Sequence, residues 1–264
     1  MKPNYTFIQK SLFFPEYGIL AVGDLHLGYE HAMRQSGVLI PETQIKEVIN
    51  DLKVIFHEIK TKNLKLKKIV FIGDIKHSFN YEYQEKNYFR KIMDFLKQNI
   101  KEKNIIFIKG NHDTIDFSYV QNANFGAPKN PTNKTQGFSG GKMKKDYTCK
   151  DIAFIHGDKS FKEIFDKKIK TIVLGHIHPS VILRDKQNIK REKYKCFLVG
   201  KFKSKETIIL PSFLNIIEGS PVNSYKDNYK DYFSIIPKIT LENFKVFVIG
   251  NDKTYEFGKV KKLK

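Results

Sequence analysis

The chain is constrained most by a series of short apolar segments, each followed by a polar turn that contains histidine or aspartate. Six of the chain's eight histidines lie in these turns. A random scatter of histidine would not favour the ends of apolar segments so strongly. The five turns are residues 24–26, 73–77, 110–113, 156–158 and 175–178. The sequence therefore predicts strands whose ends bring these polar groups together.

In the first half, apolar segments alternate with helical patterns. Residues 19–22, 68–72 and 105–108 are apolar almost throughout, which is typical of strands buried on both faces. Residues 41–59 and 83–98 carry apolar side chains at helical spacing. Strand, helix, strand, helix, strand indicates parallel strands joined by crossover helices. The ligand site of such a sheet lies at the carboxyl ends of its strands, where the first three turns fall.

In the second half, residues 152–155 and 171–174 resume the pattern of buried strands, with a helix expected over residues 159–168 between them. The chain after the last turn is expected to be mainly β. Strands are also expected over residues 5–14, 195–199, 207–210 and 245–249.

One domain over residues 1–264 is expected, because no low-complexity linker or second apolar core divides the chain. Residues 118–148, rich in Gly, Asn, Pro, Lys and Ser, are expected to form a long surface loop with room for a short hairpin. Residues 259–264 are expected to form a basic, frayed tail.

The composition favours a cytoplasmic protein without a membrane partner. Apolar residues make up 41% of the chain, enough for a sizeable core. No apolar run approaches the ~20 residues of a membrane helix, and the amino terminus lacks the apolar stretch of a secretory signal. Cys149 and Cys196 match no zinc spacing and fit reduced residues better than a disulfide.

The formal charge of +19 suggests an anionic partner such as nucleic acid. All but four of the 47 basic residues are lysine, which neutralises phosphates but lacks the bidentate fork that reads guanine. Binding would therefore be sequence-nonspecific. A lysine excess with abundant Asn and Ile is also what coding bias or a heat-adapted surface produces, and both interpretations remain open.

The turns carry groups that bind metal. Asp24 and His26 stand two residues apart, which on an extended strand end points both side chains the same way. His176 and His178 have the same spacing, and the two oxygens of Asp74 could bridge two ions. The remaining candidate donors are Asn111 and His156.

Imidazole, carboxylate and amide donors without a thiolate favour borderline or hard divalent ions. Two ions about 3.5–4 Å apart can activate water and stabilise both oxygens of an in-line displacement. We therefore expect a site for two divalent ions that hydrolyses a phosphoester. Mn²⁺ is the favoured ion, with Fe, Co, Ni or Zn as alternatives.

These motifs, in this order, resemble the calcineurin-like metallophosphoesterase superfamily. The resemblance implies an α/β fold with two mixed sheets in a four-layer α/β/β/α sandwich. It also implies two metal sites that share Asp74. The first would comprise Asp24, His26, Asp74 and His178, and the second Asp74, Asn111, His156 and His176.

The same resemblance implies that His112 is catalytic and binds no metal. Near the phosphate, its ring would protonate the leaving oxygen or stabilise charge on the phosphoryl group. Asp113 is expected to orient that ring as a hydrogen-bond acceptor. His77, three residues after Asp74, is expected to position the substrate.

A narrower resemblance points to DNA repair. Residues 74–77 resemble the Asp-X-X-His of SbcD-like nucleases, where the extra histidine assists catalysis. Together with residues 24–30 and 210–213, they are similar to small prokaryotic SbcD-related phosphoesterases. The short segment after His178 leaves little room for a DNA-capping domain plus an ATPase-docking segment. The chain has no ATP-binding P-loop motif, so any ATPase partner would be another protein.

Three functions remain under consideration. The leading hypothesis is a metal-dependent phosphodiesterase that acts on nucleic acid. One alternative is an enzyme for cyclic nucleotides or other small phosphoesters. Another is a scaffold that kept the fold and lost the chemistry, although such proteins usually lose a ligand or the catalytic histidine, and here all are present.

Overall fold

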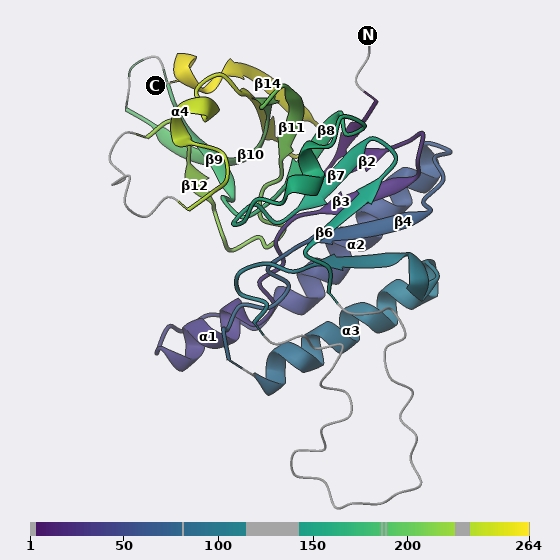
Figure 1. Cartoon of the computed structure of the whole chain (residues 1–264). Helices are drawn as coiled ribbons and strands as arrows, with labels where there is room; N and C mark the ends of the chain where they lie inside the picture. Colours follow the sequence, from purple (N-terminus) through teal and green to yellow (C-terminus); the bar gives the residue numbers. More distant parts are fainter. Residues whose placement is uncertain are drawn as a thin grey trace, which may run out of the picture.

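The computed structural model describes residues 4–80, 82–114, 143–185, 187, 189–224 and 233–263. Over these ranges the chain forms two β-sheets that pack face to face, with two long helices against one outer face (Figure 1). One sheet has five strands and the other has nine. The expected arrangement of two mixed sheets with helices is confirmed.

The five-stranded sheet contains the first three polar turns. Its strands pair in sequence order, antiparallel from β1 to β3 and parallel from β3 to β5. The expected strand over residues 5–14 is a hairpin of two strands, and Gln9 in its turn has a φ of 51°. The strands are β1 (Thr6–Ile8), β2 (Ser11–Phe14), β3 (Ile19–Val22), β4 (Lys68–Ile72) and β5 (Ile105–Ile108).

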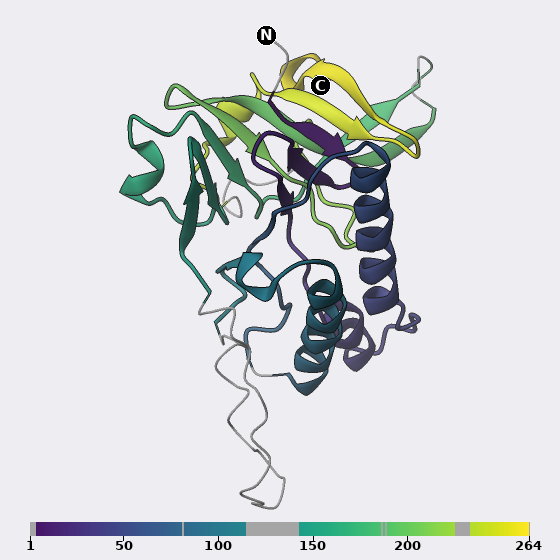
Figure 2. The same cartoon turned by 90° about the vertical axis from the view of Figure 1, so that its right-hand side faces the viewer.

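Two crossover helices cover the outer face of this sheet. They are α2 (Gln44–Thr61) and α3 (Tyr83–Asn99), close to the expected ranges, and Figure 2 shows them on the same side of the molecule. Their apolar stripes pack on the sheet as one core. The shorter helix α1 (Tyr29–Gln35), which precedes α2, was not expected.

The nine-stranded sheet contains the last two polar turns. Its strands β7, β8 and β11 are parallel, and β10 pairs with β9, β11 and β13. The sequence missed β9, β12 and β14. The strands are β6 (Asp146–Cys149), β7 (Ile152–Ile155), β8 (Thr171–Leu174), β9 (Pro179–Arg184), β10 (Arg191–Phe202), β11 (Lys205–Ile209), β12 (Ser220–Pro221), β13 (Lys245–Ile249) and β14 (Thr254–Lys259).

The layers are held by three apolar cores. One lies between the sheets, one under α2 and α3, and one on the outer face of the nine-stranded sheet. Among the described residues, the helices that pack on this last face are short, which makes the fourth layer thin. They are the 3₁₀ helix at Lys162–Phe165, α4 (Lys238–Leu241) and the 3₁₀ helix at Val260–Lys262.

Three expectations from the sequence need correction. The helix expected over residues 159–168 is a single 3₁₀ turn. The loop expected over residues 118–148 is too long at its end, because residues 146–148 belong to β6, which pairs with β7; residues 118–142 lie outside the described chain. The tail expected at 259–264 is docked through 263, since Val260 is buried and its amide donates to Phe244 O.

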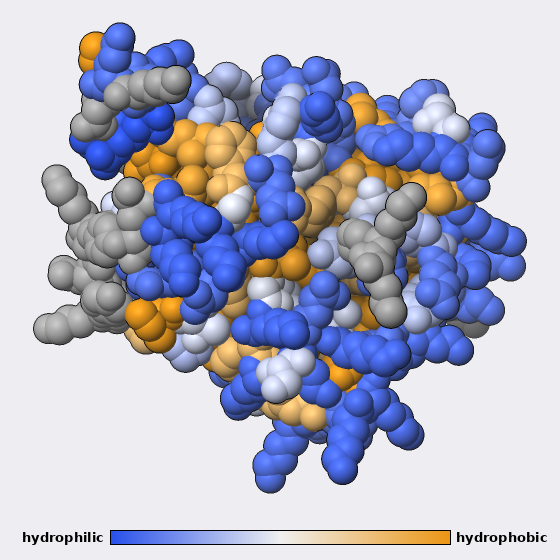
Figure 3. Space-filling view, turned by 90° about the horizontal axis from the view of Figure 1, so that it is seen from above, coloured by the Kyte–Doolittle hydropathy of each residue, from blue (hydrophilic) through white to orange (hydrophobic). Residues whose placement is uncertain are grey.

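The surface and the cysteines agree with the composition. Hydrophilic side chains cover much of the face seen in Figure 3, with smaller hydrophobic patches between them. No helix among the described residues is long and apolar enough to cross a membrane. Cys196 is buried, Cys149 is half-buried, and both are free.

All five polar turns meet at one edge of the sandwich. The parallel strands β3, β4 and β5 end there on one side of the interface, and β7, β8 and β11 end there on the other. Because carboxyl ends of parallel strands lie at the same edge, side chains just beyond them face each other across the seam.

Lys195 on β10 braces this edge. Its ammonium donates to the backbone oxygens of Ser212 (3.0 Å) and Leu214. The Ser212 hydroxyl in turn donates to Asp24 O at 3.3 Å. Burial, and then the charge of Lys10, lower the pKa of Lys195 to about 7. The brace is therefore a lysine that loses its proton far more easily than usual.

The stability that Lys195 contributes should depend on pH. Between about 7 and its ordinary value of 10.5, the unfolded chain binds a proton that the folded chain has released. The free energy of unfolding of the wild type should therefore rise through this window relative to the Lys195→Met variant, as measured by urea denaturation. The control is Lys201→Met, an exposed lysine of the same strand. The same pH trend in both variants would contradict the assignment.

Candidate metal centre

The first cluster joins the turn after β3 to the turn after β8. Asp24, His26 and His178 each offer a ligand atom within 4.8 Å of the others. The Nε2 atoms of His26 and His178 are 3.2 Å apart, with the two ring planes at 87°, and His178 Nε2 lies 3.5 Å from Asp24 Oδ1. Asp24 is fully buried and His26 is almost so.

The second cluster joins the turns after β4, β7 and β8. Asp74, His156 and His176 again lie within 4.8 Å of one another. His156 Nε2 is 3.0 Å from Asn111 Oδ1, 3.1 Å from His176 Nδ1 and 3.3 Å from Asp74 Oδ2. The far nitrogens of both rings donate to backbone oxygens, His156 Nδ1 to Ile72 O and His176 Nε2 to that of Phe233. These bonds fix the orientation of both rings, so that the other nitrogen of each ring faces the cluster. Metal-bound histidines are held in the same way.

Asp74 lies between the two clusters. Its Oδ2 is 3.3 Å from His156 Nε2 in the second cluster and 3.7 Å from His26 Nε2 in the first. Its Oδ1 accepts a hydrogen bond from the backbone amide of His112 at 2.9 Å. One carboxylate therefore faces both clusters, in the position of a bridging ligand.

The seven expected ligands thus converge, but not by the local geometry expected for them. His26 has a φ of 42°, so residues 24–26 are not extended, and His176 and His178 have φ values of 71° and 44°. The side chains of His176 and His178 enter different clusters, although their spacing predicted that they would point the same way. Left-handed backbone at non-glycine residues is costly and concentrates at functional sites.

Side chains that the sequence did not single out hold these turns. Gln44 donates to His26 O (2.7 Å) and accepts from the amide of Gly28 (3.1 Å). Glu85 accepts from the amides of His77 (3.1 Å) and Ser78 (2.6 Å). Both side chains are buried polar groups on the otherwise apolar faces of α2 and α3. That misplaced polarity is the signal by which sequence reasoning could have found them.

Burial and charge oppose each other at the carboxylates. Burial would raise the pKa of Asp24, but His178 and His156 outweigh it and leave that pKa below its usual value. The pKa of Asp74 is likewise lowered, because its bond with His156 outweighs burial. Burial disfavours a proton on His156, yet the two carboxylates raise the pKa of His156 to about 10. Burial, with the nearby His178, lowers the pKa of His26 to about 3.

The residues present therefore fit divalent ions. Two buried carboxylates attract positive charge, which a proton on His156 supplies in part and a cation would supply more fully. The donors are carboxylate oxygens, imidazole nitrogens and one amide oxygen, with no thiolate within the described clusters. This set suits Mn and the neighbouring transition metals.

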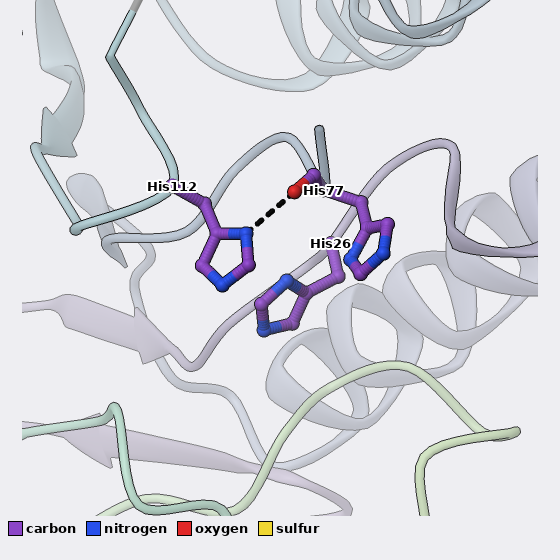
Figure 4. A group of neighbouring side chains, drawn as sticks. All are labelled: His26, His77 and His112. Atoms are coloured by element: carbon purple, nitrogen blue, oxygen red, sulfur yellow. Dashed lines mark hydrogen bonds between the residues drawn. The ribbon is translucent and has the colours of Figure 1, made fainter. Parts of the chain in front are cut away.

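A third group of histidines adjoins the first cluster. His26, His77 and His112 lie within 4.8 Å of one another, and their rings approach from three segments (Figure 4). His112 Nδ1 donates to the backbone oxygen of His77 at 2.5 Å. That bond leaves His112 Nε2 free to act on a ligand.

Asp113 does not orient the His112 ring, contrary to expectation. Its fully buried carboxylate accepts from the backbone amides of Ile75 (3.0 Å), Lys76 (3.2 Å) and Gly110 (2.9 Å). Burial, with the charge of Asp74, raises the pKa of Asp113 to about 6. Asp113 therefore ties the turns after β4 and β5 together, because its carboxylate accepts from backbone amides of both turns.

A family model for calcineurin-like phosphoesterases matches residues 17–196. The chain belongs to this family. The match includes every polar turn of the site, so the chain is a hydrolase of phosphoester bonds. The family uses divalent metal ions, which agrees with the two carboxylate and histidine clusters.

One of the similar solved structures supports the fold of this phosphoesterase. The chain is similar to nuclease MPE from Pseudomonas putida, with 16% identity and a TM-score of 0.56 over 96% of this chain and 100% of that one. Vacuolar protein sorting 29 from Cryptosporidium parvum is a weaker match (14%, TM-score 0.34, 91% and 97%). So is a predicted phosphoesterase from Streptococcus pneumoniae (11%, TM-score 0.31, 91% and 97%). No curated protein sequence matches the chain.

Gly175 leaves room for the Asp24 carboxylate, which yields a test of the first cluster. A Cβ at Gly175 would lie 2.4 Å from Asp24 Oδ2. Gly175→Ala should therefore displace this carboxylate and weaken Mn²⁺ binding about 10- to 100-fold, the usual effect of disturbing the surroundings of a ligand. The affinity is measured by titration calorimetry.

The matched control for Gly175→Ala is Gly250→Ala in the β13–β14 turn. There the atoms nearest to a Cβ would be in the movable ring of Tyr255, at 2.6 Å, and the backbone oxygen of Lys253, at 3.0 Å. The control should bind Mn²⁺ as the wild type does. Equal affinity in both variants would remove Asp24 from the metal centre.

Proposed function

We propose that this phosphoesterase binds two divalent ions, with Mn²⁺ preferred, and hydrolyses phosphodiester bonds in nucleic acid. The observation that carries the two-ion part is the position of Asp74. Its Oδ2 is within 4 Å of a histidine nitrogen in each cluster. A carboxylate in that position can bind two ions at once and keep them close enough to act on one phosphate.

In this proposal, Asp24, His26, Asp74 and His178 hold one ion, and Asp74, Asn111, His156 and His176 hold the other. Two ions held there would activate water as the nucleophile and balance the charge of the phosphodiester. His112 presents Nε2 to the phosphate, because its Nδ1 is occupied by His77 O. When protonated on both nitrogens, His112 would donate the Nε2 proton to the leaving oxygen and would then remain as a neutral ring with its hydrogen on Nδ1. His77 positions the substrate beside it.

Charge favours nucleic acid as the substrate. A formal charge of +19 attracts a polyanion, and its lysines suit contact with phosphates more than with bases. The similar Pseudomonas putida structure is described as a nuclease, which supports the same class of substrate.

His112→Ala should nearly abolish turnover and leave metal binding unchanged. Loss of a general acid costs about 10²- to 10⁴-fold in rate, so hydrolysis of a thymidine dinucleotide with Mn²⁺, whose sugar oxygen needs a proton to leave, should fall by that factor. Mn²⁺ affinity should stay near the wild-type value, because His112 is not a proposed ligand. His57→Ala is the control, since that histidine is exposed on α2. Unchanged turnover in His112→Ala would exclude this role.

The bridging role of Asp74 predicts a difference in stoichiometry. Asp74→Asn should weaken the binding of both ions, whereas His176→Ala should weaken the binding of the second ion alone. After dialysis against micromolar Mn²⁺, metal analysis should find close to no Mn²⁺ in Asp74→Asn and about one Mn²⁺ per chain in His176→Ala. Two ions retained by Asp74→Asn would argue against a shared carboxylate.

A substrate panel with Mn²⁺ decides between nucleic acid and small phosphoesters. Single-stranded DNA, RNA and bis(p-nitrophenyl) phosphate should all be cleaved, and cleavage of the polynucleotides should weaken steeply with added salt. Activity on the small diester without activity on any polynucleotide would favour the small-molecule alternative. No hydrolysis of any of them, with metal bound, would favour a scaffold.

A further inference from the structure

Phe79 is an exposed aromatic residue at the candidate catalytic histidine. It lies between β4 and α3, and 54% of its surface is exposed. Its ring stacks on that of His112, with centroids 4.4 Å apart and planes at 24°. A single exposed apolar side chain is ordinary, but this one adjoins the group proposed to act on the phosphate.

The ring of Phe79 ends a row of aromatic contacts. His112 stacks on His77 at 5.5 Å and 22°, and the edge of His77 meets Tyr29 at 4.8 Å. Figure 4 shows the two histidines of this row side by side. Because His112 covers one face of Phe79, the exposed area of Phe79 is its opposite face and its edge.

The backbone around Phe79 is held in place by hydrogen bonds to buried side chains. The amides of His77 and Ser78 donate to Glu85, which is fully buried on α3. The buried ammonium of Lys76 donates to the backbone oxygens of Ser78 and Asn80. These bonds lie on both sides of Phe79 in the sequence.

A further bond holds Phe79 from the neighbouring turn. The Thr114 hydroxyl donates to the backbone oxygen of Phe79 itself. An apolar side chain on a movable loop could turn inward and leave water. Phe79 instead sits on a fixed backbone with one face in water, which is the arrangement of a preorganised binding surface.

We infer that Phe79 is a stacking platform for an unpaired nucleobase next to the scissile phosphate. This rests on the proposed function and narrows its substrate to single-stranded or locally unpaired nucleic acid. Every base has a π-face, so stacking on Phe79 needs no base-specific hydrogen bond and agrees with lysine-dominated, sequence-nonspecific contacts. In a duplex, both faces of each base are covered by its neighbours, and a base must leave the stack to reach Phe79.

The chain has no tryptophan, which allows a direct binding test. Phe79→Trp introduces one tryptophan at the platform, which is excited at a wavelength that the 13 tyrosines do not absorb. The ligand is a cleavage-resistant phosphorothioate oligothymidylate. The fluorescence should be quenched on titration with this oligonucleotide and unchanged with its abasic counterpart of the same length and charge. The matched control is Phe257→Trp on β14, where the replaced ring is 42% exposed. Its fluorescence should not distinguish the two ligands.

A catalytic test uses two diesters with the same leaving group. One is the p-nitrophenyl ester of thymidine 5′-monophosphate, and the other lacks the base. Phe79→Ala should lower kcat/KM for the first about 5- to 150-fold, the range of one base–aromatic stack, and leave the second near wild type. Phe79→Tyr should restore the preference. An equal loss on both diesters would mean that Phe79 only positions His112, and no loss on either would also overturn the platform.

The two tests separate this inference from the function on which it rests. Hydrolysis of both diesters at equal rates, without base-dependent quenching, would reject the platform and keep the phosphodiesterase. Base-dependent quenching without hydrolysis of either diester would keep the platform and reject the proposed reaction. Absence of both effects would reject both.

Discussion

The structure depends on two carboxylates that are buried at the seam between its sheets. Asp24 comes from the turn after β3 and Asp74 from the turn after β4, and both are almost inaccessible to water. Each accepts a hydrogen bond from a backbone amide of another turn, Asp24 from His176 and Asp74 from His112. Such charges are costly to bury unless positive groups compensate them. The surrounding imidazoles compensate part of this negative charge. The negative charge that remains favours the binding of metal cations.

This constraint explains why the backbone around the site is unusual. A ligand must leave its strand, turn sharply and still point at a shared centre, so His26, Asp74, His176 and His178 adopt left-handed φ values. Such backbone needs support from outside the turns. Buried polar side chains supply it: Gln44 and Glu85 reach in from the helices, Asp113 ties two turns together, and Lys195 braces a third.

The same supports extend to the substrate side of the site. Glu85 holds the turn that carries both His77 and the segment with Phe79, so one helix residue fixes a candidate catalytic group and an exposed ring together. In the proposed function, the net charge of +19 would add a long-range attraction that does not read a sequence. A metal centre for phosphate, an exposed ring for a base and this charge would together suit a flexible polyanion.

The buried strands, both crossover helices and the seven candidate ligands could be predicted from the sequence, because apolar periodicity and the polar turns are local signals. The helix α1, the strands β9, β12 and β14 and the role of Asp113 could not. Those depend on partners far along the chain: Asp113 follows His112 directly in sequence, but its carboxylate accepts hydrogen bonds from amides 37 and 38 residues away. The family resemblance assigned His176 and His178 to different clusters, whereas their two-residue spacing alone predicted a shared face, because it did not show the positive φ values that make these side chains diverge. Only tertiary structure sets those distances, because they arise from the packing of one sheet on the other.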